Sequence, residues 1–205
     1  MKRKARSLIL VSGALWLFAV GLGLGILLNY ENTPGAPGAP PATWPADSRI
    51  QRTRGLPTLV MLVHPRCPCT RASVEELAQL MAHCQGLLTA HVLFLKPAGF
   101  SEDWTQTDLY RSAAMIPGVR VACDDEGVEA RRFGATTSGQ TFLYHSDGRL
   151  LFKGGITSSR GHVGDNTGRN AILSILTEGT ADRTETFVFG CGLFGPQPEN
   201  AGAKR

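Results

Sequence analysis

The sequence predicts an α/β domain, with a mixed sheet flanked by helices, preceded by one N-terminal transmembrane helix. Three observations predict this class. Strand-like and helix-like segments alternate between residues 55 and 179, as expected for a sheet with helices on its faces. A β-hairpin pattern follows at 140–156, and an uncharged apolar run fills residues 7–28. The chain has 205 residues, enough for one domain of ordinary size with terminal segments.

The apolar run at 7–28 has the length of a membrane span. As a helix it is about 33 Å long, against about 30 Å for the hydrocarbon core of a bilayer. A basic arm, residues 1–6, precedes the run, and its four basic side chains equal the whole net charge of +4. Such residues are retained on the cytoplasmic side. We therefore expect an uncleaved, single-pass signal-anchor, with the rest of the chain outside the cytoplasm; a cleaved signal peptide is the alternative.

Residues 29–54 are rich in proline, glycine and alanine. This composition favours a semi-extended chain and does not build a packed core. We expect a spacer that holds the following domain away from the membrane surface. Because the basic excess is confined to the N-terminal arm, the sequence shows no basic face, and no nucleic-acid partner is expected.

The domain is predicted at 55–179, with a C-terminal extension at 180–205. Apolar runs rich in β-branched residues predict strands, and apolar residues at spacings of three and four predict helices. The hairpin is the clearest signal, because two apolar runs flank the turn signature Ser146-Asp147-Gly148. In chain order, the predicted elements are strands at 56–65, 87–97 and 118–125 that alternate with helices at 67–84, 101–116 and 126–135, then the hairpin and a last helix at 165–179.

Cys67 and Cys69 lie where the first predicted strand meets the first predicted helix, with Pro68 between them. The first turn of a helix has unpaired backbone N–H groups and a partial positive charge, which stabilise a thiolate and lower its pKa. Proline suits the first helical position because no N–H is needed there. The pattern predicts a redox-active pair in which Cys67 is the more exposed, attacking thiol and Cys69 resolves the mixed disulfide.

A disulfide between Cys67 and Cys69 would close a very small ring. Their Cα atoms are expected to lie roughly 5.5–7 Å apart, at the upper limit of what a disulfide spans. Such a bridge gains little from loop entropy and is easily reduced, as expected of a disulfide donor or isomerase. Outside the cytoplasm disulfides are permitted, and with five cysteines one stays unpaired. Cys191 in the extension is expected to pair with Cys84 or Cys123, or to resolve the active pair, and the sequence does not choose between these.

The order of the elements, the cysteine pair at the first strand–helix junction and the late hairpin together resemble the thioredoxin-like fold, most closely its membrane-anchored bacterial redoxins, over roughly residues 55–178. The resemblance implies a thiol–disulfide oxidoreductase in the bacterial inner membrane, with its domain facing the periplasm or the exterior. The usual pair has two residues between its cysteines; the Cys-Pro-Cys variant has one, which places Arg66 where the first cysteine usually stands. Redoxins also carry a cis-proline before the hairpin, beside the substrate groove, and here Ser138 or Gly139 fills that position.

The resemblance also implies partners, namely the thiols of secreted or membrane proteins and an upstream membrane electron donor or acceptor, and this chemistry needs no cofactor. In this hypothesis His64, just before the pair, lowers the pKa of the Cys67 thiol when it is protonated; otherwise it is a partly exposed loop histidine. The alternative is a copper-binding or metallochaperone protein that uses Cys67, Cys69 and either His64 or His162, because soft thiolates with imidazole suit copper. A third hypothesis is a redox-inactive interaction module.

Overall fold

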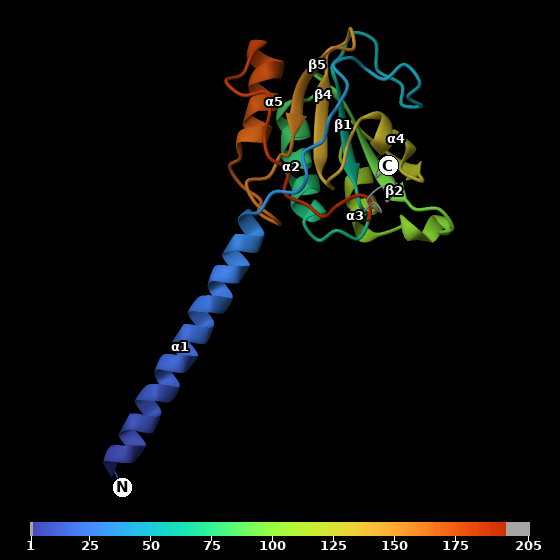
Figure 1. Ribbon diagram of the computed structural model, residues 1–205. Coiled ribbons are helices and arrows are strands. Elements are labelled where there is room, and N and C mark those ends of the chain that lie inside the picture. The colour runs from blue at the N-terminus through green and yellow to red at the C-terminus, as the bar shows by residue number, and fades with distance from the viewer. Residues whose placement is uncertain (1, 196–205) are drawn as a thin grey trace, which may run out of the picture. The chain divides into compact units, whose positions relative to one another are not determined.

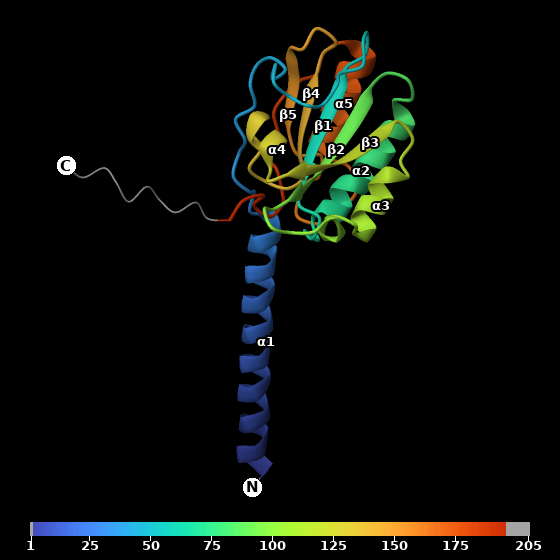
Figure 2. The ribbon, with the colours of Figure 1, turned by 90° about the vertical axis from the view of Figure 1, so that its right-hand side faces the viewer.

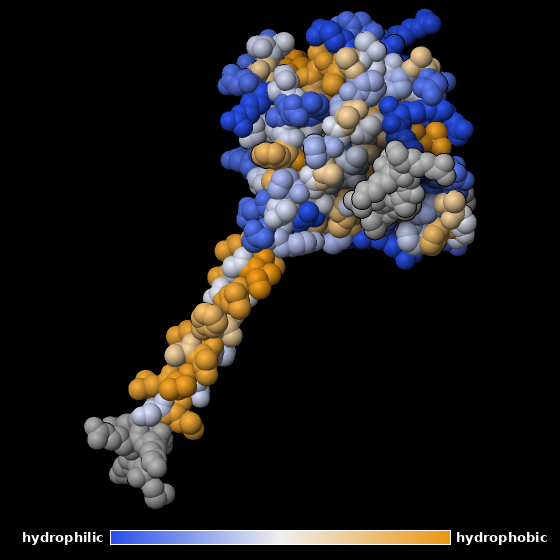
Figure 3. All heavy atoms as spheres, viewed as in Figure 1, coloured by the Kyte–Doolittle hydropathy of each residue, from blue (hydrophilic) through white to orange (hydrophobic). Residues whose placement is uncertain are grey.

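The computed structural model describes residues 2–195, and the chain divides after Thr33 into two compact units. The first unit is helix α1 (Lys2–Asn32). Its segment Ser7–Asn32 has a mean hydropathy of 2.2, and Figure 3 shows apolar side chains along it. Within the described residues it is the one helix long and apolar enough to cross a membrane, a criterion that an N-terminal signal sequence also meets.

The second unit is built on one five-stranded sheet with the strand order β3-β2-β1-β4-β5 (Figure 1). The central strand β1 is parallel to β2 and antiparallel to β4; β2 is parallel to β3, and β4 and β5 form the antiparallel hairpin. The predicted mixed sheet is thereby confirmed. The strands are β1 (Thr58–Val63), β2 (Thr89–Lys96), β3 (Val119–Asp125), β4 (Gln140–Tyr144) and β5 (Leu150–Gly154), and the helices are α2 (Thr70–His83), α3 (Asp108–Ala114), α4 (Val128–Arg132) and α5 (Thr167–Glu178).

Helices cover both faces of this sheet (Figure 2). Successive residues of a strand point to opposite faces, and every residue of β1 is buried. Leu59, Met61 and Val63 belong to the core shared with α2, α3 and α5. Val60 and Leu62 belong to a second core, which includes residues at the end of α4. The central strand β1 is therefore enclosed on both sides. The packing of the β1 residues fixes the point at which the following turn begins.

The helix predicted at 101–116 is interrupted. It divides into a short 3-10 helix (Glu102–Trp104) and α3, because Thr107 stands between them as an N-cap. The backbone of Thr107 is extended, with φ −89° and ψ 171°, and its side chain accepts a hydrogen bond from Tyr110 N. A cap of this kind satisfies a first-turn N–H group and starts a new helix.

Residues 34–54 of the segment predicted as a spacer pack on the domain instead, and residues 29–32 belong to α1. The compact unit begins at Pro34 and not at residue 55. Trp44 N donates a hydrogen bond to Gly148 O at 2.7 Å. The Trp44 ring lies edge-on to Phe133 and Tyr144, with ring centroids 5.0 and 5.3 Å away. The correction has a simple cause: an extended chain offers its backbone groups for pairing, and one large aromatic side chain buries enough area to dock it.

His91, on β2, is a buried titratable group in this unit. Only 6% of its surface is exposed, and its Nε2 atom has no hydrogen-bond partner. Burial, and after it the charge of Arg120, lower the pKa of His91 to about 4. The imidazole is therefore neutral at pH 7, and the folded state disfavours its protonation.

We expect the stability of the domain to fall as the pH is lowered from about 6.5 to 4. Unfolded histidine has a pKa of 6.5, whereas the folded pKa of His91 is about 4, so between these values only the unfolded state binds the proton. The contribution is complete above pH 6.5, and its loss by pH 4 amounts to at most about 3 kcal/mol. Urea unfolding at a series of pH values measures it. The His91→Gln variant should lack this part of the pH dependence, and the exposed His83→Gln control should keep it. Parallel curves for wild type and His91→Gln would contradict the prediction.

Candidate functional site

Cys67 and Cys69 lie in the turn between β1 and α2, two elements that Figure 1 labels. Hydrogen bonds from Thr70 N to Cys67 O, at 3.1 Å, and from Arg71 N to Pro68 O, at 3.3 Å, close this turn. They span three residues, as in a tight turn, and not the four of an α-helix. The helix therefore begins at Thr70, with Cys69 as its N-cap. Pro68 precedes the first helical turn, which corrects the prediction that it belongs to it.

The prediction that Cys67 is the more exposed thiol is wrong. Exposure alternates along the turn: Arg66 and Pro68 are exposed, whereas Cys67 and Cys69 have only 1% and 6% of their surface exposed. The C-terminal extension contacts Cys67 at this turn and brings a further cysteine to it.

Backbone pairing holds the extension next to the segment that precedes β4. Ser138 N donates to Cys191 O, and Leu193 N donates to Thr136 O, both at 2.8 Å. This short antiparallel pairing places the sulfur of Cys191 3.1 Å from the sulfur of Cys67. The extension therefore brings a thiol from near the end of the chain to the pair after β1.

Two residues hold the extension close to the site: Gly190 allows a close backbone approach, and Arg160 forms a hydrogen bond to it. A Cβ atom on Gly190 would lie 2.0 Å from Ser138 O, so only glycine allows this close approach. The carbonyl of Gly190 accepts a hydrogen bond from the Arg160 guanidinium at 2.6 Å. Arg160 comes from the loop before α5 and also lies next to Cys69, where its hydrogen bond and charge act to lower the thiol pKa. This loop reaches the site through Arg160, whereas His162 is exposed.

The thiol cluster consists of Cys67, Cys69 and Cys191, whose sulfur atoms all lie within 4.8 Å of one another. Burial acts to raise the pKa of Cys67, but hydrogen bonds from Cys191 and Thr70 outweigh it, and the pKa is lowered. Burial, and then the charge of Cys67, raise the pKa of Cys69 against the opposing effect of Arg160. Burial, and then the hydrogen bond to Cys67, raise the pKa of Cys191 to about 12. Cys67 is therefore the thiol of the cluster that ionises most readily, whereas ionisation of Cys69 and Cys191 is disfavoured.

Ser138 and Gly139 lie beside the thiol cluster. Ser138 Oγ is 2.7 Å from Thr70 Oγ1 and accepts a hydrogen bond from His64 N, also at 2.7 Å. Gly139 has a φ of +89°, and its N–H donates to Leu62 O at 2.9 Å. Between residues 2 and 195 there is no cis peptide bond. Ser138 therefore joins the end of β1, the start of α2 and the C-terminal extension through hydrogen bonds.

The structure does not bring either histidine of the predicted copper set together with the cysteine pair. The ring of His64 lies against Trp104, with centroids 6.1 Å apart, and its Nδ1 accepts a hydrogen bond from Arg66 N at 3.2 Å. Burial, and then the charge of Arg66, lower the pKa of His64. A neutral imidazole has no positive charge with which to lower a thiol pKa, so the structure does not support that role. Cys191 takes the third position in the group.

Sequence reasoning missed two residues and left a third open. Thr70 follows the cysteine pair at a helix start, where hydroxyl side chains are common, and this signal was sufficient to suggest it. Arg160 carries no such signal, because only the fold brings its loop to the pair. For Cys191, the structure favours the pair over the two other cysteines. Cys84 is buried in the core and Cys123 lies 3.1 Å from Thr105 Oγ1, and neither belongs to the thiol cluster.

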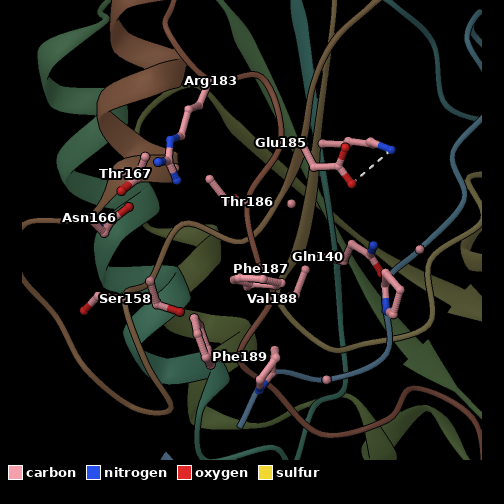
Figure 4. Close-up of a pocket in the computed structure, with 18 of the residues that line it drawn as sticks. Gln140, Ser158, Asn166, Thr167, Arg183, Glu185, Thr186, Phe187, Val188 and Phe189 are labelled. Carbon is pink, nitrogen blue, oxygen red and sulfur yellow. Dashed lines mark ion pairs between the residues drawn. The ribbon is translucent and has the colours of Figure 1, made fainter. Parts of the chain in front are cut away.

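A separate pocket of about 880 Å³ lies between the start of α5 and the residues 183–189 (Figure 4). In Figure 4, Asn166 and Thr167 lie on one side of it and Glu185 on the other. Glu185 forms an ion pair with Lys153 at 3.1 Å. None of the described residues that line this pocket is a cysteine or a histidine. The chemistry of the thiol cluster therefore does not extend into it.

Comparison with known proteins identifies similar folds only among solved structures. No protein-family model and no curated protein matches the sequence. An uncharacterized conserved protein from Geobacillus kaustophilus is 16% identical, with a TM-score of 0.56 over 81% of this chain and 94% of that chain. A hypothetical protein from Sinorhizobium meliloti is 21% identical, with a TM-score of 0.55 over 78% of this chain and 93% of that chain. A secreted disulfide oxidoreductase of Mycobacterium tuberculosis is 14% identical, with a TM-score of 0.43 over 61% of this chain and 83% of that chain.

Likenesses at these identities concern the fold alone. The five-stranded mixed sheet with helices on both faces, the turn after the central strand and the late hairpin define a thioredoxin-like fold. This fold class is what the sequence predicts. An activity has to be argued from the thiol cluster itself.

We expect the Gly190→Ala variant to expose Cys67. The added Cβ would meet Ser138 O at 2.0 Å, so the extension has to move. An overpacking cost of about 1.4 kcal/mol or more makes the open state at least about tenfold more populated. The rate at which iodoacetamide alkylates Cys67 in the reduced protein, followed by tandem mass spectrometry, measures the change. Gly195→Ala is the matched control, because among the described residues, apart from its chain neighbours, no atom lies within 4 Å of a Cβ there. Equal rates in the two variants would show that the extension does not limit access to Cys67.

Proposed function

We propose that this chain is a membrane-tethered, extracytoplasmic thiol–disulfide oxidoreductase with Cys67 as its nucleophile. One observation carries the proposal: three thiols with sulfurs within 4.8 Å of one another meet at the turn before a helix. The unequal surroundings of the three give them different roles. The thiolate is the form that attacks disulfides, and the hydrogen bonds of the cluster converge on Cys67.

The first step is attack by the Cys67 thiolate on one sulfur of a substrate disulfide. A new S–S bond forms to Cys67, the substrate S–S bond breaks, and the leaving thiolate takes up a proton. In the second step Cys69 loses its proton and attacks the sulfur of Cys67. The mixed disulfide breaks, the substrate leaves with two thiols, and the protein keeps a Cys67–Cys69 disulfide, so two electrons have passed to the substrate. The same steps in reverse oxidise a dithiol, and the reduction potentials of the partners set the direction.

Cys191 competes with Cys69 for the second step, since its sulfur lies 3.1 Å from that of Cys67. The two products differ in stability. A bridge between neighbouring residues gains little from loop entropy, whereas Cys67 and Cys191 are 124 positions apart. A disulfide over such a loop restricts the unfolded chain and stabilises the fold by about 5 kcal/mol in the chain-entropy model. We therefore assign Cys67–Cys69 as the readily exchanged form and Cys67–Cys191 as a resting form.

Access for a protein partner requires the extension to leave the turn. Its pairing with the residues before β4 uses backbone groups, which any extended polypeptide also offers. A cysteine-containing segment of a partner can take the place of residues 190–193 and present its sulfur to Cys67. The partners in this proposal are the thiols of secreted or membrane proteins, with an upstream membrane electron donor or acceptor. The apolar segment Ser7–Asn32 of α1 supports the tether, and the basic residues that precede this segment support an extracytoplasmic domain in the bacterial inner membrane.

We expect oxidation of the reduced full-length chain by glutathione disulfide to form bridges that contain Cys67. The Cys69→Ser variant should form Cys67–Cys191, and the Cys191→Ser variant should form Cys67–Cys69, which is reduced by a milder glutathione ratio. Removing Cys67 should slow disulfide formation in the cluster by about tenfold or more, because raised thiol pKa values reduce the thiolate fraction. Peptide mapping after alkylation measures all three, with Cys84→Ser and Cys123→Ser as controls. A Cys67→Ser chain that oxidises as fast as wild type would disprove the assignment of the nucleophile.

We expect a chain that lacks both resolving thiols, Cys69→Ala with Cys191→Ala, to accumulate mixed disulfides with its partners. The second step then has no attacking thiol, so the captured partner stays bonded to Cys67. Non-reducing electrophoresis of the membrane fraction and mass spectrometry of the captured bands measure this. The matched control adds Cys67→Ala and should capture nothing. If no partner is captured and the oxidation above also fails, the domain is a redox-inactive interaction module.

A further inference from the structure

We propose that the thiol cluster, when fully reduced, binds one copper(I) ion through the sulfurs of Cys67, Cys69 and Cys191. This is a second use of the same atoms and does not depend on electron transfer. The thiols lose their protons to the solvent as the three metal–sulfur bonds form, and no oxidant or reductant takes part.

The spacing of the sulfurs fits a three-coordinate site. Metal–thiolate bonds of about 2.3 Å place the ligands of a planar trigonal site about 4 Å apart. In the structure all three sulfurs lie within 4.8 Å of one another, with Cys67 and Cys191 closest at 3.1 Å. Side-chain adjustments of less than about 1 Å per pair therefore bring the sulfurs to bonding positions. The turn and the paired extension already fix the backbones that carry them.

The donor set selects a soft monovalent ion. In the described part of the chain, the group holds three thiols and no carboxylate or imidazole. Soft thiolates favour copper(I), whereas oxygen ligands favour hard cations such as magnesium and calcium. Zinc requires a fourth ligand, which in three-ligand sites is a water molecule. The described side chains supply only three ligands here, of which Cys67 and Cys69 are almost completely buried. Three-coordinate copper(I) is therefore the ion that the site fits.

The surroundings of the cluster suit the charge of such a site. Three thiolates around one monovalent ion carry a net charge of −2. Arg160 places a positive charge next to Cys69 and is fixed by its hydrogen bond to Gly190 O at 2.6 Å. The Thr70 hydroxyl and N–H donate to Cys67. Charge-assisted hydrogen bonds of this kind stabilise buried anions. The metal and the disulfide exclude each other, because a sulfur in a disulfide is no longer a thiolate ligand.

The test is a titration of the reduced full-length chain, held anaerobically in detergent micelles, with copper(I) in competition with a coloured copper(I) chelator. We expect one copper ion per chain. The Cys191→Ser variant should bind at least about 100-fold more weakly, because loss of a ligand exceeds the 10- to 100-fold cost of losing a supporting residue. Cys84→Ser and Cys123→Ser are the matched controls and should bind as wild type does. X-ray absorption of the copper-loaded chain should show three sulfur ligands and no nitrogen.

A second variant keeps the test independent of ligand loss. Gly190→Ala leaves all three sulfurs in the chain but displaces the extension that carries Cys191, so copper affinity should fall by about tenfold or more. Circular dichroism verifies that each variant is folded. The proposal is overturned if the reduced wild type does not compete with the chelator, if Cys191→Ser binds as tightly as wild type, or if nitrogen ligands appear. Oxidation of copper-free wild type by glutathione disulfide, followed by peptide mapping, shows separately whether the oxidoreductase proposal holds.

Discussion

The pairing of the C-terminal extension with the segment before β4 is the constraint on which the candidate site depends. Two backbone hydrogen bonds of 2.8 Å fix residues 191–193 against 136–138. They determine where the third sulfur lies, why Cys67 is buried, and how the thiol reaches its hydrogen-bond partners. The Cys-Pro-Cys turn meets this extension directly, since the sulfur of Cys191 lies 3.1 Å from that of Cys67. Together, the turn and the extension form a site with three thiols.

Burial and hydrogen bonding act in opposite directions on the three sulfurs. Removing a thiolate from water is costly, and on Cys69 and Cys191 this cost prevails, so their pKa values rise. On Cys67 the donors Cys191 and Thr70 outweigh it. The proposed electron transfer and the proposed copper binding would both use this difference between the three sulfurs. The two proposed uses exclude each other, because a sulfur in a disulfide is not a thiolate ligand.

Local patterns in the sequence were sufficient to predict the class of fold and the position of the cysteine pair. The apolar run of β1 and the hairpin turn are encoded within a few residues, and so is the placement of Cys67 and Cys69 between a strand and a helix. Even locally, one capping side chain changed the outcome, since Thr107 divides a predicted helix.

Contacts between segments that are distant in the sequence could not be predicted from such local patterns. The docking of the predicted spacer rests on Trp44, and the closure of the site rests on Cys191 and Arg160, each of which meets its partners only after the sheet has formed. The predicted exposure of Cys67 failed for the same reason, because a distant segment covers it. Composition predicted a spacer at 29–54, but its first residues belong to α1, which ends at Asn32. It carried no information on what residues 34–54 touch, and residues 196–205 of the predicted extension lie outside the described residues.

Cys191 follows every strand and α5 in the chain, so the three thiols of the cluster are not synthesised together. A ribosome completes all five strands and α5 before it adds this residue, so the third thiol is the last part of the cluster to be made. The cluster is complete only when residues 191–193 have paired with residues 136–138. A protease that cuts after Gly179 would separate Cys191 from the domain without cutting a strand. Loss of the cut segment would leave only Cys67 and Cys69 at this site.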